Sequence, residues 1–214
     1  MERITGQIRK YDGERLVIVA PYSGDHFLLT RQVKECEVCL RDNREITARQ
    51  RRYIYAMLRD IAAYTGHSPE ELKDYFKAQW VAQTGGEWFS LSDTDMTTAN
   101  ELIEIIIGFC VEWCIPTRDN LAEFAPDIGR YIYLCLTRKV CCITRQKAEL
   151  HHVDAVGAGR NRKEIVHQGM KVLPLSRKLH IEIHSIGKER FCEKYHVYGV
   201  ALDAELCRIW KVRS

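Results

Sequence analysis

Six of the eight histidines in this chain fall between residues 151 and 196, and two of them are adjacent. The adjacent pair, His151 and His152, lies in the apolar stretch LHHVD, which is typical of a short buried strand. Because side chains on a strand alternate between its faces, the two rings must point to opposite sides and contact different partners. His180 and His184 follow four residues apart, a spacing that puts both rings on one face of a helix. Together they predict a strand and a helix that share one metal ion, with one strand histidine left free as a base.

A plainer interpretation is open for each histidine taken singly. A lone histidine on an apolar strand is usually a core residue with a satisfied hydrogen bond, not a ligand. Four histidines that combine a strand doublet with helical spacing favour the metal site. For His26, His67 and His196, which have no such company, we keep the structural interpretation.

The charge of the chain is unevenly distributed. Residues 1–135 hold 16 Lys and Arg against 21 Asp and Glu, a net charge of −5, whereas residues 136–190 hold 12 against 5, a net charge of +7. A positive segment around the histidines predicts an anionic partner such as nucleic acid. An ordinary solvated basic face is the alternative.

Local patterns predict strands first and helices afterwards. QIRKY, the turn Asp12-Gly13 and RLVIVA predict a hairpin, and the alternating segment KECEVCL (34–40) predicts another strand. A helix is expected from Thr47 to Gly66, and Ser68-Pro69-Glu70-Glu71 predicts the start of a second one.

A third helix is expected to open at Thr98, with Glu101 three residues on, and to end before Pro116. Its predicted apolar face comprises Leu102, Ile105, Ile106, Phe109 and Trp113. PTRDNLAEFAP (116–126) is expected to be a linker, and DIGRYIYLCLTRK (127–139) a helix that leads into the basic segment.

The residues around the histidines carry a family resemblance. AELHHVDAVG, followed by VLPLSRKLHIEIH, resembles the HNH endonuclease motif, a β-hairpin packed against a helix around one divalent cation, over residues of about 136 to 200. The whole chain is similar to phage-encoded HNH nucleases, also in ITARQRRYIYAMLRDI, FSLSD and EKYHVYG. Residues of about 47 to 115 are loosely similar to phage recombination mediators of the Orf/NinB kind, which bind single-stranded DNA.

The resemblance implies a role for each of the four histidines. His151 would be a metal ligand, His152 the general base, and His180 and His184 the remaining ligands. One divalent cation is implied; Mg²⁺ or Mn²⁺ is expected, although an all-histidine set also suits Zn²⁺ or Ni²⁺.

The sequence departs from the family pattern in two places. The four positions of the structural zinc knuckle hold only one cysteine, so we predict no structural zinc; they are Cys141, Thr144, Ser176 and Leu179. Packing of Ile143, Val172, Leu175 and Leu179 is expected to stabilise this region instead. The family asparagine that steadies the base aligns near Lys171, and His167 or Asn161 are the candidates for its role.

Further residues are candidates for contacts with nucleic acid. Arg160, Arg162 and Lys163, on a loop after the doublet, are candidate phosphate contacts, with a solvated loop as the alternative. A second basic patch is open at Arg49, Arg51 and Arg52, although Asp60 and its acidic surroundings argue against it. The aromatic rings of Tyr53, Tyr55 and Tyr64 could stack on bases, but we expect them to pack in the core.

These observations predict an α+β protein with a small N-terminal β unit (1–45), a central helical domain (46–120) and a C-terminal ββα-metal nuclease domain (121–214). We expect a metal-dependent HNH endonuclease that hydrolyses DNA phosphodiester bonds in phage DNA processing or recombination. The alternative is a single-stranded-DNA-binding recombination accessory protein with a degenerate HNH unit. Without an apolar leader or a membrane-length segment, the protein is expected in the bacterial cytoplasm, with double- or single-stranded DNA as partner and homo-oligomerisation open.

Overall fold

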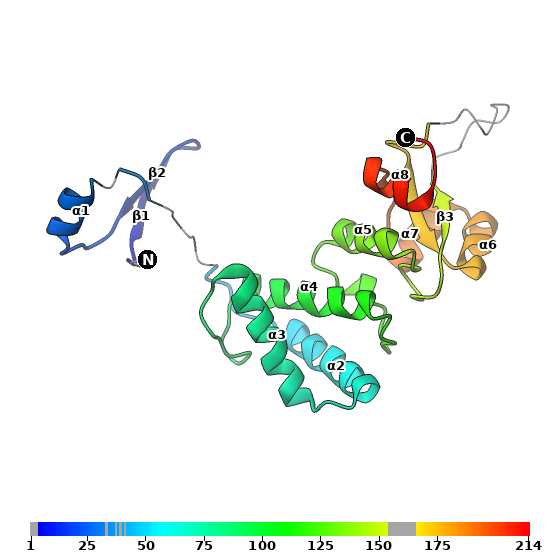
Figure 1. Ribbon diagram of the computed structural model, residues 1–214, viewed down its shortest axis with the longest axis horizontal. Coiled ribbons are helices and arrows are strands. Elements are labelled where there is room, and N and C mark those ends of the chain that lie inside the picture. Colours follow the sequence, from blue (N-terminus) through cyan, green and yellow to red (C-terminus); the bar gives the residue numbers. More distant parts are fainter. Residues whose placement is uncertain (1–3, 33, 37, 39, 41, 154–165) are drawn as a thin grey trace. The chain divides into compact units, whose positions relative to one another are not determined.

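The computed structural model describes residues 4–32, 34–36, 38, 40, 42–153 and 166–214. Its contacts divide the chain into two compact units, residues 1–41 and residues 42–214. Within the described residues the protein is mixed α/β, with eight α-helices and two small antiparallel sheets (Figure 1). None of the described helices combines the length and the hydropathy needed to cross a membrane.

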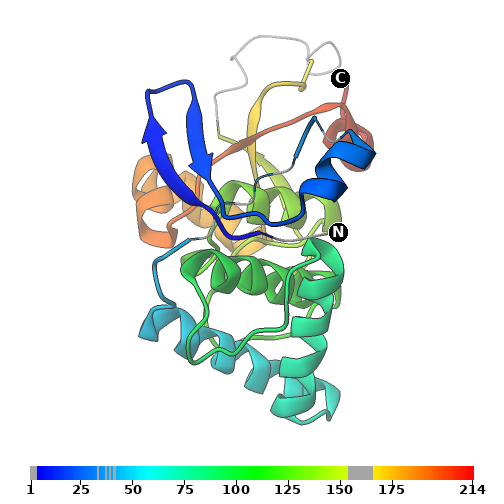
Figure 2. The same cartoon turned by 90° about the vertical axis from the view of Figure 1, so that its left-hand side faces the viewer.

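The N-terminal unit contains the predicted hairpin. Strands β1 (Gln7–Tyr11) and β2 (Leu16–Val19) pair antiparallel, as Figure 2 shows. Asp12 makes the turn by accepting hydrogen bonds from the backbone N–H groups of Glu14 and Arg15.

The strand expected over residues 34–40 was a wrong prediction. The described residues of that segment lie in no strand, and an unpredicted helix, α1 (Asp25–Arg31), precedes them. Val38 and Leu40 are 51% and 62% exposed. Alternation alone therefore failed as a signal, because the described residues of this segment pair with no strand and are all exposed.

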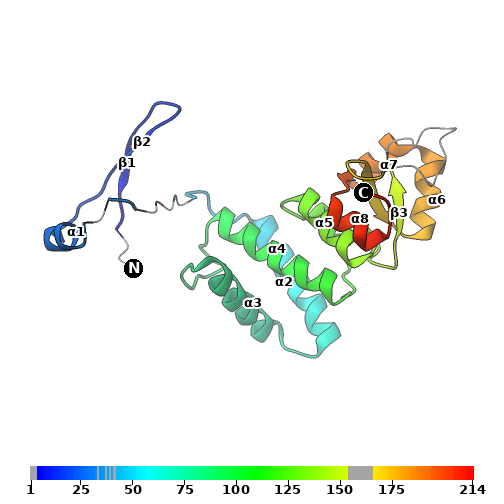
Figure 3. The ribbon, with the colours of Figure 1, turned by 45° about the horizontal axis from the view of Figure 1, so that its top comes forward.

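In the second unit, one helix starts and ends where its caps predict, and the next starts where its capping box predicts. Helix α2 (Ala48–Thr65) begins with a reciprocal capping box between Thr47 and Gln50 and ends at Gly66, which has a φ of 82°. Helix α3 (Pro69–Thr84) begins with the same device between Ser68 and Glu71. The side-by-side packing of α2, α3 and α4 is visible in Figure 3.

Helix α4 (Met96–Glu112) starts earlier than predicted. Asp95, not Thr98, is its N-cap, and the Asp95 carboxylate accepts from both the backbone N–H and the hydroxyl of Thr98. Asp is preferred to Thr at an N-cap, and its negative charge is stabilised by the positive end of the helix dipole. Trp113, expected on the apolar face, lies at the C-cap and is 61% exposed.

The expected linker over residues 116–126 is partly structured. It contains a 3-10 helix, η1 (Leu121–Glu123), and Leu121 is fully buried. Nearby, buried Asp60 accepts hydrogen bonds from the backbone N–H and from Nε of Arg118, at 2.9 and 2.8 Å. The buried Leu121 and the ion pair between Asp60 and Arg118 thus attach the segment to the helical core. Its mostly polar composition gave no sign of this.

The tyrosines of α2 differ in their surroundings. Tyr53 is 4% exposed and stacks on Phe124 with ring centroids 3.8 Å apart, which confirms core packing for this residue. Tyr64 is 59% exposed, so core packing was wrong there. Tyr55 is half-buried and lines a cavity.

The predicted strand, strand and helix around the histidines are all present. Strand β3 (Glu149–His152) pairs with β4 (Lys171–Leu175), which also pairs with β5 (Val200–Ala201), all antiparallel. Helix α6 (Arg177–Ile186) contacts β3 and β4. The remaining helices are α5 (Ile128–Arg138), as predicted, α7 (Lys188–Tyr195) and α8 (Ala204–Trp210).

The second unit has one continuous apolar core. It runs from the helices α2 to α5 into the sheet, where Val172, Leu175 and Leu179 are buried and Ile143 packs against them. The predicted packing in place of a zinc knuckle is confirmed for these four residues. The domain boundary near residue 120 stays a prediction.

Candidate metal centre

Three histidines from two elements converge beside the sheet. His151 comes from β3, and His180 and His184 come from successive turns of α6. One ring nitrogen of each can be chosen so that all three lie within 4.8 Å of one another. Ring centroids are 4.9 Å apart between His151 and either helix histidine, and 5.2 Å apart between His180 and His184. This arrangement can hold one divalent metal ion.

The burial of the three rings changes across the cluster. His151 is only 5% exposed, His180 is half-buried and His184 is exposed. The cluster therefore has a closed side against the sheet and an open side at α6. An open side is what a catalytic metal needs, since substrate or water must complete its coordination.

His151 fits a ligand role better than a core role. Its Nδ1 is buried and has no hydrogen-bond partner among the described residues. Burial, and after it the neighbouring His180 and His184, lower the pKa of His151 to about 4. The ring is thus neutral near pH 7, the state that can donate a lone pair to a metal ion.

A carboxylate orients His180. Nδ1 of His180 lies 2.7 Å from Oε2 of Glu149, and Arg177 reaches both oxygens of Glu149 at 3.2 Å. The hydrogen bonds from His180 and Arg177 lower the pKa of Glu149. With its Nδ1–H donated to the carboxylate, a neutral His180 keeps the lone pair of Nε2 for a metal ion, a common support for metal-binding histidines.

Glu149 was not among the predicted site residues, although its place in the sequence indicated it. Glu149 stands two residues before His151 on the same strand, and alternation puts both side chains on one face. A carboxylate in that position would have been expected beside the helix histidines.

His152 has a partner of its own. Its Nε2 lies 2.8 Å from Nδ1 of His167, and the ring centroids are 4.9 Å apart. The prediction that the two rings of the doublet contact different partners is confirmed. Burial, followed by the influence of His167 and His180, lowers the pKa of His152.

The backbone around His167 is fixed by three hydrogen bonds. The N–H of His167 donates to the carbonyl oxygen of Arg213 at 2.8 Å, and the N–H of Met170 donates back to the carbonyl oxygen of His167. Gly169, with a φ of 83°, donates to the carbonyl oxygen of Leu202. His167, one of the two candidates for the missing asparagine, is therefore held beside the doublet by the C-terminal segment.

Other predicted site residues have different outcomes. Arg160, Arg162 and Lys163, the candidate phosphate contacts, lie outside the described residues, as does Asn161. At the knuckle positions, Cys141 is fully buried, and Ser176 and Leu179 are each 5% exposed. The backbone N–H of Cys142 donates to the carbonyl oxygen of Pro174 in β4, so this loop is attached to the sheet directly.

Comparison with known proteins gives one family. A family model described as "Putative HNHc nuclease" matches residues 23–213, which is most of the chain. No curated protein and no solved structure matches.

Proposed function

This chain belongs to the HNHc nuclease family, and from that premise we propose that it is a metal-dependent endonuclease that hydrolyses DNA phosphodiester bonds. The observation that carries the proposal is that two adjacent histidines contact different partners. His151 joins the metal-competent cluster, and His152 joins His167. A nuclease of one metal needs both a ligand and a base close to one phosphate.

His151, His180 and His184 would hold the ion. A divalent cation bound there would supply positive charge to neutralise the phosphate and the leaving oxygen. Glu149 would fix the tautomer of His180, and the apolar surroundings would keep His151 neutral. Mg²⁺ or Mn²⁺ is the expected metal from its availability and the substrate chemistry, whereas the all-nitrogen ligand set also suits Zn²⁺ or Ni²⁺.

His152 would take a proton from the attacking water. A neutral imidazole has one N–H and one lone pair, so Nδ1 of His152 can act as base only if Nε2 carries the hydrogen. Nδ1 of His167, 2.8 Å away, can accept that hydrogen bond. His167 would thereby select the reactive tautomer and steady the ring, the role that asparagine has in the family pattern.

The proposal of DNA as the substrate rests on sequence features in addition to the family. The net charge of +7 over residues 136–190 supports DNA as the substrate, with Arg160, Arg162 and Lys163 as phosphate contacts. Phage DNA processing or recombination is the proposed setting, in the bacterial cytoplasm. The three-part domain division at residues 45 and 120 is part of the same proposal.

A nicking assay tests the proposed activity. Supercoiled plasmid and single-stranded DNA are incubated with the full chain and Mg²⁺, Mn²⁺, Zn²⁺ or Ni²⁺, and the products are separated on gels. We expect nicks with at least one metal and their loss in His152→Ala, while His67→Ala, a change at an exposed histidine outside the cluster, cuts as the unchanged chain does. Equal cutting by the His152→Ala protein would disprove the role of the base.

The second candidate is a single-stranded-DNA-binding accessory protein with a degenerate HNH unit. It is favoured by the loss of cysteine at three knuckle positions, Thr144, Ser176 and Leu179. It predicts binding of single-stranded DNA without cleavage under any metal. The same assay, run with a filter-binding measurement, therefore separates the two candidates.

A further inference from the structure

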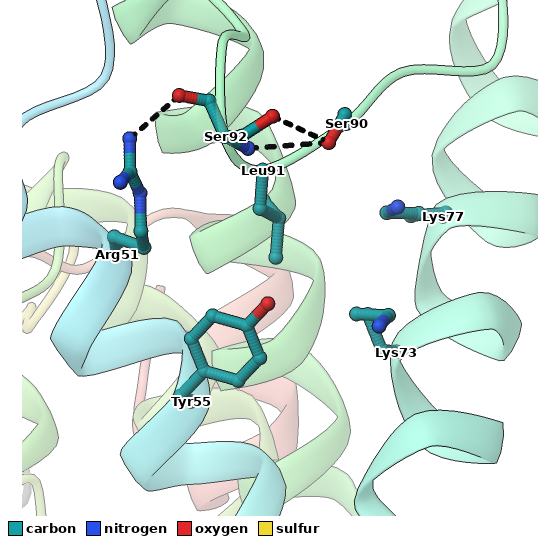
Figure 4. Close-up of a pocket in the computed structure, with 7 residues that line it drawn as sticks. All are labelled: Arg51, Tyr55, Lys73, Lys77, Ser90, Leu91 and Ser92. Carbon is teal, nitrogen blue, oxygen red and sulfur yellow. Dashed lines mark hydrogen bonds between the residues drawn. The ribbon is translucent and has the colours of Figure 1, made fainter.

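A small basic cavity lies among the helices of the second unit, between α2, α3 and the segment 90–92. Its volume is about 190 Å³. The polar residues of its lining are Arg51, Tyr55, Lys73, Lys77, Ser90 and Ser92. The lysines extend from α3, Arg51 and Tyr55 from α2, and the two serines from the connecting segment (Figure 4). None of these residues belongs to the histidine cluster.

Lys77 is a largely buried lysine whose ammonium group has no ion-pair partner among the described residues. The residue is 6% exposed, and its ammonium group makes no ion pair with any carboxylate that the structure describes. The rings of Trp88 and Phe89 lie 5.4 and 5.5 Å from the ammonium nitrogen. Burial, followed by the charge of Lys73, lowers its pKa. Aromatic faces attract a cation but accept no strong hydrogen bond, so the three N–H donors of Lys77 are left for another group.

Arg51 and Lys73 add two more positive charges. Nη2 of Arg51 donates to the carbonyl oxygen of Ser92 at 2.8 Å, and its Nε is buried without a partner among the described residues. Lys73 pairs with Glu70, whose side chain is 72% exposed. The cavity lining therefore contains three cations, and within the part of the chain that the structure describes the only carboxylate paired with any of them is that of the largely exposed Glu70.

The segment 90–92 contributes hydroxyl groups. The hydroxyl oxygens of Ser90 and Ser92 lie 2.9 Å apart, and the backbone N–H of Ser92 donates to Oγ of Ser90. One hydroxyl hydrogen of the pair is used between them, and the other is free to donate. Cations on two helices and a hydroxyl donor between them form a site for an anion with several oxygens.

We propose that this cavity binds a terminal phosphate group, that is, a phosphate monoester or inorganic phosphate. A monoester carries a charge of about −1.5 to −2 at pH 7 and three acceptor oxygens, which suits a cavity lined by three cations from two helices. An internal phosphodiester has a single charge and two free oxygens, and it would leave Lys77 or Arg51 uncompensated. The phosphate can come from a free phosphate or nucleotide, or from the phosphorylated end of a nucleic-acid strand.

Binding measurements on the full chain in EDTA test the proposal without relying on nuclease activity. Calorimetry measures the affinity for inorganic phosphate. Fluorescence anisotropy measures the affinity for a labelled single-stranded oligonucleotide that carries either a 5′-phosphate or a 5′-hydroxyl. Lys77→Met removes the ammonium and keeps an unbranched chain of similar length. Arg59→Met, at an exposed position of α2, is the matched control for loss of one positive charge.

We expect phosphate to bind to the unchanged protein. Lys77→Met should lower the affinity for phosphate about tenfold or more, because one charge-assisted hydrogen bond is lost. Arg59→Met should change this affinity less than twofold. If the protein prefers the 5′-phosphate oligonucleotide and Lys77→Met abolishes this preference, the bound phosphate is the end of a strand. If phosphate binds without such a preference, the ligand is the free ion or a nucleotide.

Three results would overturn the proposal. The first is no measurable binding of phosphate, and the second is phosphate binding that Lys77→Met leaves unchanged. The third is that the strands with a 5′-phosphate and a 5′-hydroxyl bind equally well and both lose affinity in Lys77→Met, which would make the cavity a contact for internal phosphates. Because metal is absent, none of these results depends on whether the histidine cluster cuts DNA.

Discussion

Nε2 of His152 and Nδ1 of His167 lie 2.8 Å apart, so these two imidazoles share one hydrogen bond. One nitrogen must donate and the other accept. If Nε2 of His152 accepts, its Nδ1 carries the hydrogen and the neutral ring has no lone pair left for water. The proposed role of His152 as a base therefore requires His167 to be the acceptor.

Substitution of His167 should separate acceptor and packing roles. In His167→Asn the amide oxygen can take the place of Nδ1, whereas His167→Phe keeps a ring without an acceptor. We expect His167→Phe to slow plasmid nicking about 10- to 100-fold, a typical cost for a lost supporting contact, and His167→Asn to retain most of the rate. Metal content should be unchanged in both. Equal losses in the two variants would assign His167 to packing alone.

Removal of a cluster histidine should abolish metal binding. His151→Ala and His180→Ala each leave two of the three ligands, and we expect metal analysis after dialysis to fall from one ion per chain to near zero. A bound metal also stabilises the native state, by about 2.7 kcal/mol at a hundredfold excess over Kd. Calorimetry should therefore show that metal raises the Tm of the unchanged protein and of His67→Ala, and not that of His180→Ala. Full metal loading of His180→Ala would rule out the cluster as the site.

Glu149→Gln should weaken the metal site without removing a ligand. The amide keeps the shape of the side chain but loses the charge that favours Nδ1–H of His180. We expect metal affinity to fall about 10- to 100-fold, measured by competition with a chelating dye. Glu193→Gln, at an exposed position of α7, is the matched control and should bind as tightly as the unchanged protein. An unaltered Kd in Glu149→Gln would show that His180 needs no carboxylate.

Local spacing predicted that His180 and His184 lie on one helix face and meet one histidine of the doublet, and the resemblance to the HNH motif assigned that position to His151. Strand alternation separates His151 from His152, and the four-residue interval aligns His180 with His184, so the cluster needed only one contact between β3 and α6. The contact with His167 depends on the C-terminal segment, because the carbonyl oxygen of Arg213 holds the backbone of His167. No local pattern contains that information.

The errors in the fold have similar causes. The segment 34–40 had the alternation of a strand, but its described residues pair with no other strand, and strand pairing depends on tertiary structure. Leu121 is fully buried in a segment of mostly polar and small residues, and the hydrogen bonds between Asp60 and Arg118 that attach this segment to α2 join residues 58 positions apart. Thr98 resembled a cap, yet Asp95 three residues earlier receives its N–H. Asp is preferred to Thr at the N-cap, so residue preference also favoured the earlier position.

The ion pair between Asp60 and Arg118 should matter for stability. The side chain of Asp60 is 9% exposed and accepts two hydrogen bonds from Arg118, one from the backbone and one from the guanidinium. Asp60→Ala leaves the backbone N–H of Arg118 without its acceptor, and we expect a loss of about 1–3 kcal/mol in the free energy of unfolding, measured with urea. Asp93→Ala, at an exposed position, should change it by less than about 0.5 kcal/mol. A change as small in Asp60→Ala would mean that Leu121 holds the segment without this pair.

Lys77→Met should stabilise the phosphate-free protein. The residue is 6% exposed with no ion-pair partner among the described residues, and burial lowers the pKa of its ammonium group, so an apolar chain at this position removes a desolvation cost that the nearby Asp74 and Glu70 only partly offset. A gain of about 1 kcal/mol would raise the Tm by about 2–4 °C in a chain of this length, whereas Arg59→Met should leave it unchanged. Added phosphate should raise the Tm of the unchanged protein and not that of Lys77→Met, because only a ligand that binds the native state shifts the transition. A lower Tm for Lys77→Met without phosphate would instead show that the rings of Trp88 and Phe89 compensate the ammonium group fully.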